Sequence, residues 1–171
     1  MRQQPPAMPH MPNQLATAQI GRCGELLVQY KLLKHGIESA SMTTDTGIDL
    51  VACSPARPDA LTIQVKANLK GKPGGGKGKP HLDWWIPRDS PANLIALVDL
   101  DTERVWLFTP AEIVGVAQQK PDNRLHFFMA LDPSTQNRRD GKPVHDHAFE
   151  SHLLTNMVHR IFFPPTAVMK P

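Results

Sequence analysis

The fold is decided by Gly47-Ile48-Asp49-Leu50-Val51-Ala52-Cys53 and by Leu61-Thr62-Ile63-Gln64-Val65-Lys66, which follows after a turn-rich loop. Both runs are short and rich in apolar and β-branched residues, which is typical of successive strands. Alternate residues of a strand share a face, so Gln64 and Lys66 point one way and Ile63 points the other. The pattern predicts two neighbouring strands, 48–53 and 61–66, with polar side chains on one face.

Pairing Asp49 with Lys66 in a hairpin would bring three polar side chains together, those of Asp49, Gln64 and Lys66. The same register turns the apolar residues of both strands toward the core, whereas a slip by one residue would bury Lys66. Carboxylate and amide oxygens are ligands that hard cations such as Mg²⁺ accept. A bound metal polarises phosphate and acidifies water, so the cluster favours phosphodiester hydrolysis.

A helix is predicted over residues 16–35, ending before Gly36. One apolar stripe on it consists of Ile20, Cys23, Leu27, Tyr30 and Leu33. Val28 and Leu32 lie on a second side, next to Glu25. A helix that is apolar on two sides packs on two sides, so we expect Glu25 to face protein.

The rest of the chain predicts an α/β fold, a central mixed β-sheet flanked by helices. The near-continuous apolar run 94–100 is typical of a central strand that is buried on both faces. Further strands are expected at 37–42 and 105–109, and another is expected to start at 83–86. Helices are expected at 110–118 and 149–159, and residues 120–147 are expected to be irregular.

The length of 171 residues indicates one domain with tails. We expect a disordered tail over 1–14, a single domain over 15–160 with a flexible basic loop at 70–80, and an extended tail over 161–171. The net charge of +3 permits a polyanionic partner. No secretory signal or membrane-spanning run is visible. Cys23 and Cys53 do not form a disulfide framework, so a cytoplasmic protein is expected.

These residues resemble the PD-(D/E)xK nuclease superfamily, most closely its Holliday-junction-resolvase-like and Mrr-like restriction branches. The resemblance rests on Gly21–Val28, Gly47–Leu50 and Gln64–Lys66. It implies a restriction-endonuclease-like core, a Mg²⁺ or Mn²⁺ cofactor and DNA as the substrate. It also implies a homodimer, because cutting two strands needs two sites.

The resemblance also implies roles for single residues. Asp49 would be the metal-binding carboxylate, and Gln64 and the Val65 carbonyl would be further ligands. Lys66 would be the base that activates water, and Glu25 the acid from the helix. Gln64 departs from the family pattern, which has an acid there, so it would bring an oxygen ligand without a charge.

The predicted function is that of a metal-dependent DNA endonuclease in defence, restriction or repair. One alternative is a nucleic-acid-binding module that kept the fold and lost catalysis, and another is a protein-interaction or inhibitor role. The lysines of the basic loop would bind DNA phosphates or belong to a solvated linker; they are Lys70, Lys72, Lys77 and Lys79.

Two other groups of residues have open roles. Trp84 and Trp85 would stack on bases, or one of them would belong to the core. Four histidines near the C-terminus fit no standard zinc spacing and are expected to form a His-rich surface; they are His145, His147, His152 and His159.

Overall fold

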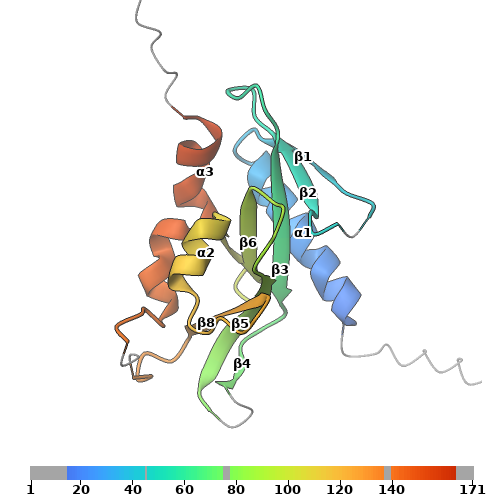
Figure 1. The fold of residues 1–171 in the computed structure, drawn as a ribbon. Coiled ribbons are helices and arrows are strands. Elements are labelled where there is room, and N and C mark those ends of the chain that lie inside the picture. The colour runs from blue at the N-terminus through green and yellow to red at the C-terminus, as the bar shows by residue number, and fades with distance from the viewer. Residues whose placement is uncertain (1–14, 45, 75–77, 137–139, 165–171) are drawn as a thin grey trace, which may run out of the picture.

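A five-stranded mixed sheet lies at the centre of the molecule, with the strand order β1-β2-β3-β6-β7 (Figure 1). The structure is a computed structural model, and it describes residues 15–44, 46–74, 78–136 and 140–164. The strands are β1 (Glu38–Ser41), β2 (Leu50–Cys53), β3 (Leu61–Asn68), β6 (Leu94–Asp99) and β7 (Arg104–Phe108). Only β3 and β6 run parallel, and the other neighbours are antiparallel.

A second sheet and the helices cover the two faces of the central sheet. The second sheet has the order β4-β5-β8 and consists of β4 (Lys72–Pro73), β5 (Pro80–Pro87) and β8 (Arg124–Ala130). The helices are α1 (Thr17–Leu33), α2 (Pro110–Val116), a 3₁₀ helix (Asp146–His152) and α3 (Leu154–Phe162). The predicted α/β class, a central mixed sheet flanked by helices, is confirmed.

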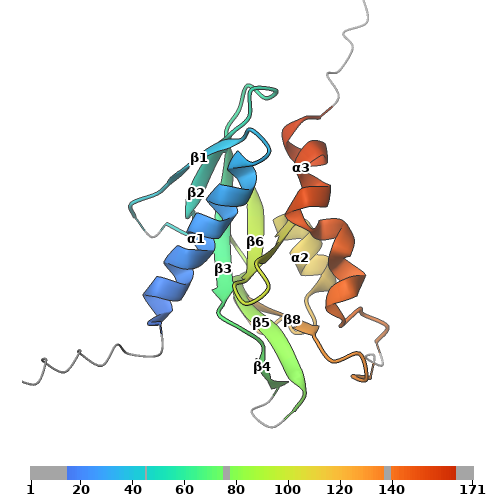
Figure 2. The ribbon, with the colours of Figure 1, turned by 180° about the vertical axis from the view of Figure 1, so that it is seen from behind.

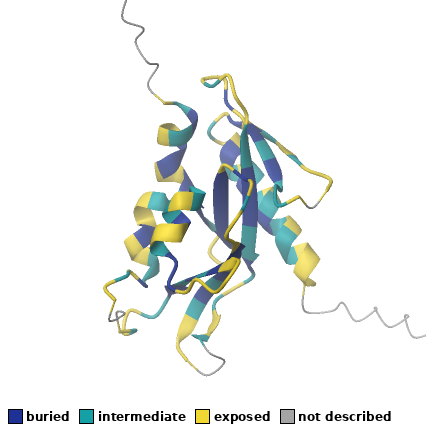
Figure 3. Ribbon diagram, viewed as in Figure 1, coloured by how far each residue is buried: buried dark blue, intermediate teal, exposed yellow. Residues whose placement is uncertain are grey.

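Helices α1 and α3 lie on one face of the central sheet (Figure 2). Val28 and Leu32 of α1 join Met157 and Val158 of α3 in one buried apolar cluster with residues of the sheet, among them Ile63. All six residues of β6 are buried (Figure 3), as its continuous apolar run predicts. Burial of this apolar area is the main driving force for this half of the fold.

The second sheet packs on the opposite face of the central sheet. Trp84 of β5 and Phe127 of β8 share a buried cluster with Ile95 of β6 and Ile113 of α2. Trp84 is 3% exposed and Trp85 is 46% exposed, so one tryptophan of the pair belongs to the core. The central sheet is therefore covered on both faces.

Three sequence predictions about helices and irregular segments were wrong. Residues 120–147 are not irregular throughout, because 124–130 form β8. The last helix is broken at Leu153, whose ψ of 138° is not helical, so a 3₁₀ helix and α3 replace a single helix over 149–159. The apolar stripe assigned to α1 is not its buried side, since Tyr30 and Leu33 are 56% and 63% exposed.

Other expectations concern the ends of the chain and the basic loop. Residues 1–14 and 165–171 lie outside the described residues, and α3 continues to Phe162, beyond the expected end of the domain. The segment expected as a basic loop contains β4. Among the described residues, no helix has the length and apolar character needed to cross a bilayer.

Helix α1 approaches β3 closely at Gly24. A Cβ atom at Gly24 would lie 2.6 Å from the Cβ of Ala67 and 3.4 Å from a methyl carbon of Val65. Real Cβ atoms do not come so close to each other, so only glycine permits this spacing. The close approach also shows that Val65 and Ala67 point toward α1.

We predict that Gly24→Ala lowers stability, because α1 or β3 must move to relieve the overlap. The expected loss is about 1–3 kcal/mol, although Ala itself favours a helix by about 1 kcal/mol over Gly. Gly21→Ala is the matched control, because a Cβ atom there meets nothing within 4 Å. Urea unfolding should show Gly24→Ala below wild type and Gly21→Ala at or above it. The reverse order would contradict the close approach.

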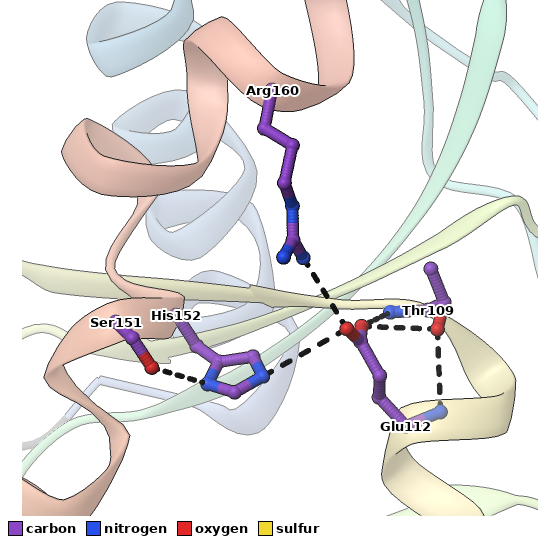
Figure 4. A network of polar contacts seen from close by, with 5 residues as sticks. All are labelled: Thr109, Glu112, Ser151, His152 and Arg160. Atoms are coloured by element: carbon purple, nitrogen blue, oxygen red, sulfur yellow. Dashed lines mark hydrogen bonds and ion pairs between the residues drawn. The ribbon is translucent and has the colours of Figure 1, made fainter.

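A polar network joins α2 to the segment containing α3 (Figure 4). Thr109 donates its backbone N–H and its hydroxyl to Oε2 of Glu112, at 2.7 and 3.0 Å. The other oxygen of Glu112 lies 3.3 Å from Arg160 Nη2 and 3.9 Å from His152 Nε2. Ser151, His152 and Glu112 have the composition of a hydrolase triad, but 3.9 Å is too long for a hydrogen bond. We assign the network a structural role.

We predict that acid lowers the stability of the fold through His152 and Glu112 of this network. Burial lowers the pKa of His152 below its ordinary value of 6.5; the charge of Glu112 opposes this, and Arg160 adds to it. Burial raises the pKa of Glu112, but the hydrogen bonds of Thr109 and the nearby positive charges outweigh it and lower that pKa below 4.5. Both groups therefore take up protons more readily in the unfolded chain.

The free energy of unfolding should then fall as the pH drops below 6.5 toward the folded-state pKa of His152, and fall again below 4.5 through Glu112. Denaturant unfolding at a series of pH values measures it. His152→Gln, which cannot titrate, should show a smaller decrease in the first window than wild type. Equal decreases would rule out His152 as a cause.

Candidate metal and DNA site

Asp49 is fixed at the start of β2 by two hydrogen bonds to β3. Its backbone N–H donates to the Ile63 carbonyl at 2.9 Å, and its Oδ2 accepts the Val65 N–H at 2.6 Å. Gly47, with φ of 79°, supplies the left-handed turn just before it. The carboxylate therefore lies where β2 and β3 separate, with one oxygen engaged by the backbone.

The register of β2 and β3 differs from the predicted one. Leu50 pairs with Ile63, so one further step along the ladder puts Asp49 opposite Gln64 and not Lys66. The shift is two residues, which keeps every side chain on its predicted face. Asp49, Gln64 and Lys66 thus share a face of the sheet, opposite to the side chains that contact α1.

Gln64 is the unusual residue of this face. It is 3% exposed, and its Oε1 is buried with no hydrogen-bond partner among the described residues. Leaving a buried acceptor unsatisfied costs roughly 1–3 kcal/mol. A Cβ atom at Gly47 would lie 3.6 Å from Gln64 Nε2, so the amide reaches the turn that precedes Asp49. An unpaired oxygen on the face that also carries Asp49 is a donor that a hard divalent cation accepts.

Lys66 lines a groove of about 620 Å³ between β3 and the start of α1. Ile20 and Gly21 form the helix side of this groove. Lys70 and Lys72 line it as well, so three lysines border one depression, which we call the lysine groove. This distribution of charge suits a phosphate backbone.

Glu25 lies apart from these residues. Its Oε2 is 2.6 Å from Arg22 Nη1, and the same nitrogen donates to Ser41 Oγ at 2.6 Å. Its helix packs on the face of β3 that carries Val65, opposite to the face of Gln64. Within the described part of the chain, Glu25 forms no hydrogen bond or ion pair with Asp49, Gln64 or Lys66.

Of the other two lysines of the predicted DNA-binding set, Lys79 is described and is not among the residues that line the lysine groove. Lys79 donates to the hydroxyl of Ser134 and lies 3.7 Å from a carboxylate oxygen of Asp132. Lys77 lies outside the described residues.

The donor set fits a hard cation only if an amide takes the place of an acid. The described residues contain no group of three His, Cys, Asp or Glu side chains with metal-binding geometry. A metal at this face would therefore depend on Asp49, on Gln64 Oε1 and on main-chain oxygen, which the resemblance assigns to the Val65 carbonyl. These are oxygen donors, which Mg²⁺ and Mn²⁺ prefer.

The fold is similar to that of a solved bacterial homing endonuclease, I-Ssp6803I. The TM-score is 0.51 and the sequence identity is 14%, over 86% of this chain and 92% of that chain. At this identity the likeness concerns the fold, which is nuclease-like. No protein-family model matches the chain, and the comparison with curated proteins found no match.

We predict that Gln64→Met stabilises the protein or leaves its stability unchanged. Methionine fills a similar volume and removes the unsatisfied buried oxygen, a gain of about 1 kcal/mol. Gln64→Glu should lower stability in EDTA, because it buries a charge, and Mg²⁺ or Mn²⁺ should restore it. Thermal unfolding with and without metal measures both variants. A large loss in Gln64→Met would mean that Oε1 has a partner in solution.

Proposed function

We propose that this protein is a metal-dependent DNA endonuclease of the PD-(D/E)xK type. The observation that carries the proposal is the buried, unpaired oxygen of Gln64 on the face that Asp49 and Lys66 share. Oxygen donors beside a lysine are what metal-assisted phosphodiester hydrolysis requires. The nuclease-like fold and the lysine groove support the same function.

In this proposal, each residue has one task. Asp49, Gln64 and the Val65 carbonyl would hold Mg²⁺ or Mn²⁺, which would supply polarisation of the phosphate and acidification of water when bound. Lys66 orients the attacking water and accepts its proton. We expect Glu25 to contribute less, because its carboxylate is paired with Arg22.

The DNA backbone would follow the lysine groove. Lys70 and Lys72 contact the phosphates on either side of the scissile bond, which fixes the register of the strand without reading its sequence. We include a homodimer in the proposal, because cleavage of both strands needs two such sites.

A nucleic-acid-binding module without catalysis is the second candidate, and Gln64 in place of an acid favours it. A module that only binds phosphates gains nothing from a buried unsatisfied amide, which lowers its stability. The two candidates differ in metal dependence, since a binding module holds DNA in EDTA and never cleaves it.

We predict that Asp49→Asn and Lys66→Met each abolish cleavage in Mg²⁺. Asparagine retains an oxygen for the Val65 N–H and loses the charge that attracts the metal. Methionine keeps the length of Lys66 and loses its proton acceptor, for a loss of about 10²–10⁴-fold in rate. Cleavage of labelled plasmid, nicked and branched DNA measures the effect.

Lys34→Ala, a change at an exposed lysine beyond the end of α1, is the control for lost positive charge and should cleave like wild type. Cleavage by Lys66→Met at the wild-type rate would remove Lys66 from the mechanism. DNA binding without cleavage under any metal condition would favour the second candidate.

A further inference from the structure

A second pocket, of about 520 Å³, lies on the outer face of the three-stranded sheet. Alternation along β5 sends Leu82 and Trp84 into the core and leaves His81 and Asp83 on the outer face. The pocket is lined by Lys72, Pro73, Gly74, His81, Asp83 and by Gln119, His126, Phe128. Its size is within the ~300–1,000 Å³ of small-molecule sites.

Flat rings form the floor of this pocket. The ring of Phe128 lies 5.6 Å from that of His81 and 5.7 Å from that of His126, measured between centroids. His126 stacks in turn on Trp85, at 4.3 Å and 6° between the planes. Partly exposed rings on one face of a sheet provide a surface on which a nucleobase can stack.

The negative charge of Asp83 in the pocket favours a nucleobase over a phosphate as the ligand. The carboxylate of Asp83 is 42% exposed and lies 3.4 Å from His126 Nε2, next to Phe128 across the strand pair. A phosphate here would meet a like charge, whereas the exocyclic amino group of a base would donate to Asp83. Lys72, at the rim, offers a positive charge for the phosphate of that nucleotide.

The pocket adjoins the lysine groove. Lys72 lines both depressions. Asn68, at the end of β3, donates its side-chain N–H to the Asp83 carbonyl at 2.7 Å and so ties the two sheets together at this point. A strand in the groove therefore passes the mouth of the pocket.

We propose that this pocket, here called the base pocket, binds an unpaired nucleobase of the DNA strand that occupies the lysine groove. The base stacks on Phe128 and donates an amino group to Asp83, so cytosine and adenine bind better than thymine. The inference rests on the proposed function for the identity of the ligand as DNA. It goes further in naming the preferred substrate, DNA with a bulge, branch or single-stranded end.

The test measures binding in EDTA, where no metal-dependent cleavage occurs. Fluorescence anisotropy compares labelled duplexes of equal length that are fully paired, carry one bulged cytosine, or carry one bulged thymine. Wild type should bind the cytosine bulge about tenfold more tightly than the paired duplex, the effect of stacking one base. The thymine bulge should fall between them.

Phe128→Leu should remove the preference for a bulge and leave affinity for the paired duplex unchanged. Asp83→Asn keeps an oxygen near His126 and should make the affinities for the cytosine and thymine bulges equal. This second variant still tests the proposal if Phe128→Leu fails to fold. Leu33→Ala, at an exposed site of α1, is the control and should behave like wild type.

The inference is overturned if wild type binds bulged and paired DNA equally, or binds neither. It is also overturned if both Phe128→Leu and Asp83→Asn keep the wild-type preferences. Cleavage in Mg²⁺ with no preference for a bulge would overturn the base pocket and leave the endonuclease intact. A preference in EDTA without any cleavage in Mg²⁺ would support the base pocket and overturn the catalytic proposal.

Discussion

The contact of α1 with β3 at Gly24 is the constraint on which the rest of the structure depends. With no Cβ at Gly24, the helix lies against Val65 and Ala67, and this contact assigns one face of β3 to the core. Because side chains alternate along a strand, those of Gln64 and Lys66 must then point to the opposite face. The same approach brings Ile20 and Gly21 of the helix to the wall of the lysine groove. One missing methyl group thus determines both the core and the position of the candidate site.

The candidate site has the energetic character of a functional site. Gln64 Oε1 is buried without a partner, and Gly47 adopts a conformation that other residues avoid. The unpaired oxygen costs free energy that the compact core must offset, whereas the turn at Gly47 is open to glycine without strain. Proteins retain such features where activity requires them, which is why the most stable sequence and the most active one differ.

Much of the fold was predictable because it follows from the spacing of apolar and polar residues along the chain. The buried run of β6, the strands around Asp49 and Gln64 and the extent of α1 all agree with the pattern of the sequence. Alternation fixes faces but not register, so a shift of two residues along β2 and β3 was invisible and Asp49 was matched to Lys66. On α1 the pattern offered two apolar sides, and only the tight contact at Gly24 decides between them.

The second sheet and its pocket were harder to find. The outward residues of β8 include Phe128, an aromatic residue beside the inward Phe127 and Met129, so the run does not alternate between apolar and polar. Its partner β5 is distant in the sequence, and no local turn signal joins them. Glu25 was singled out by its motif, and the structure adds that its carboxylate is paired with Arg22.

The position of Lys72 between the lysine groove and the base pocket connects the two depressions. If both depressions hold parts of a nucleic acid, as proposed, an anion in one screens the charge of Lys72 felt in the other, because Lys72 lines both. Occupancy of the two is therefore thermodynamically linked, and such linkage is reciprocal. The coupling is positive if one nucleotide contacts Lys72 from both depressions, and negative if two nucleotides compete for Lys72. In the proposed function, the short connection from Asn68 to Lys72 would therefore couple the two sheets in binding a polyanion.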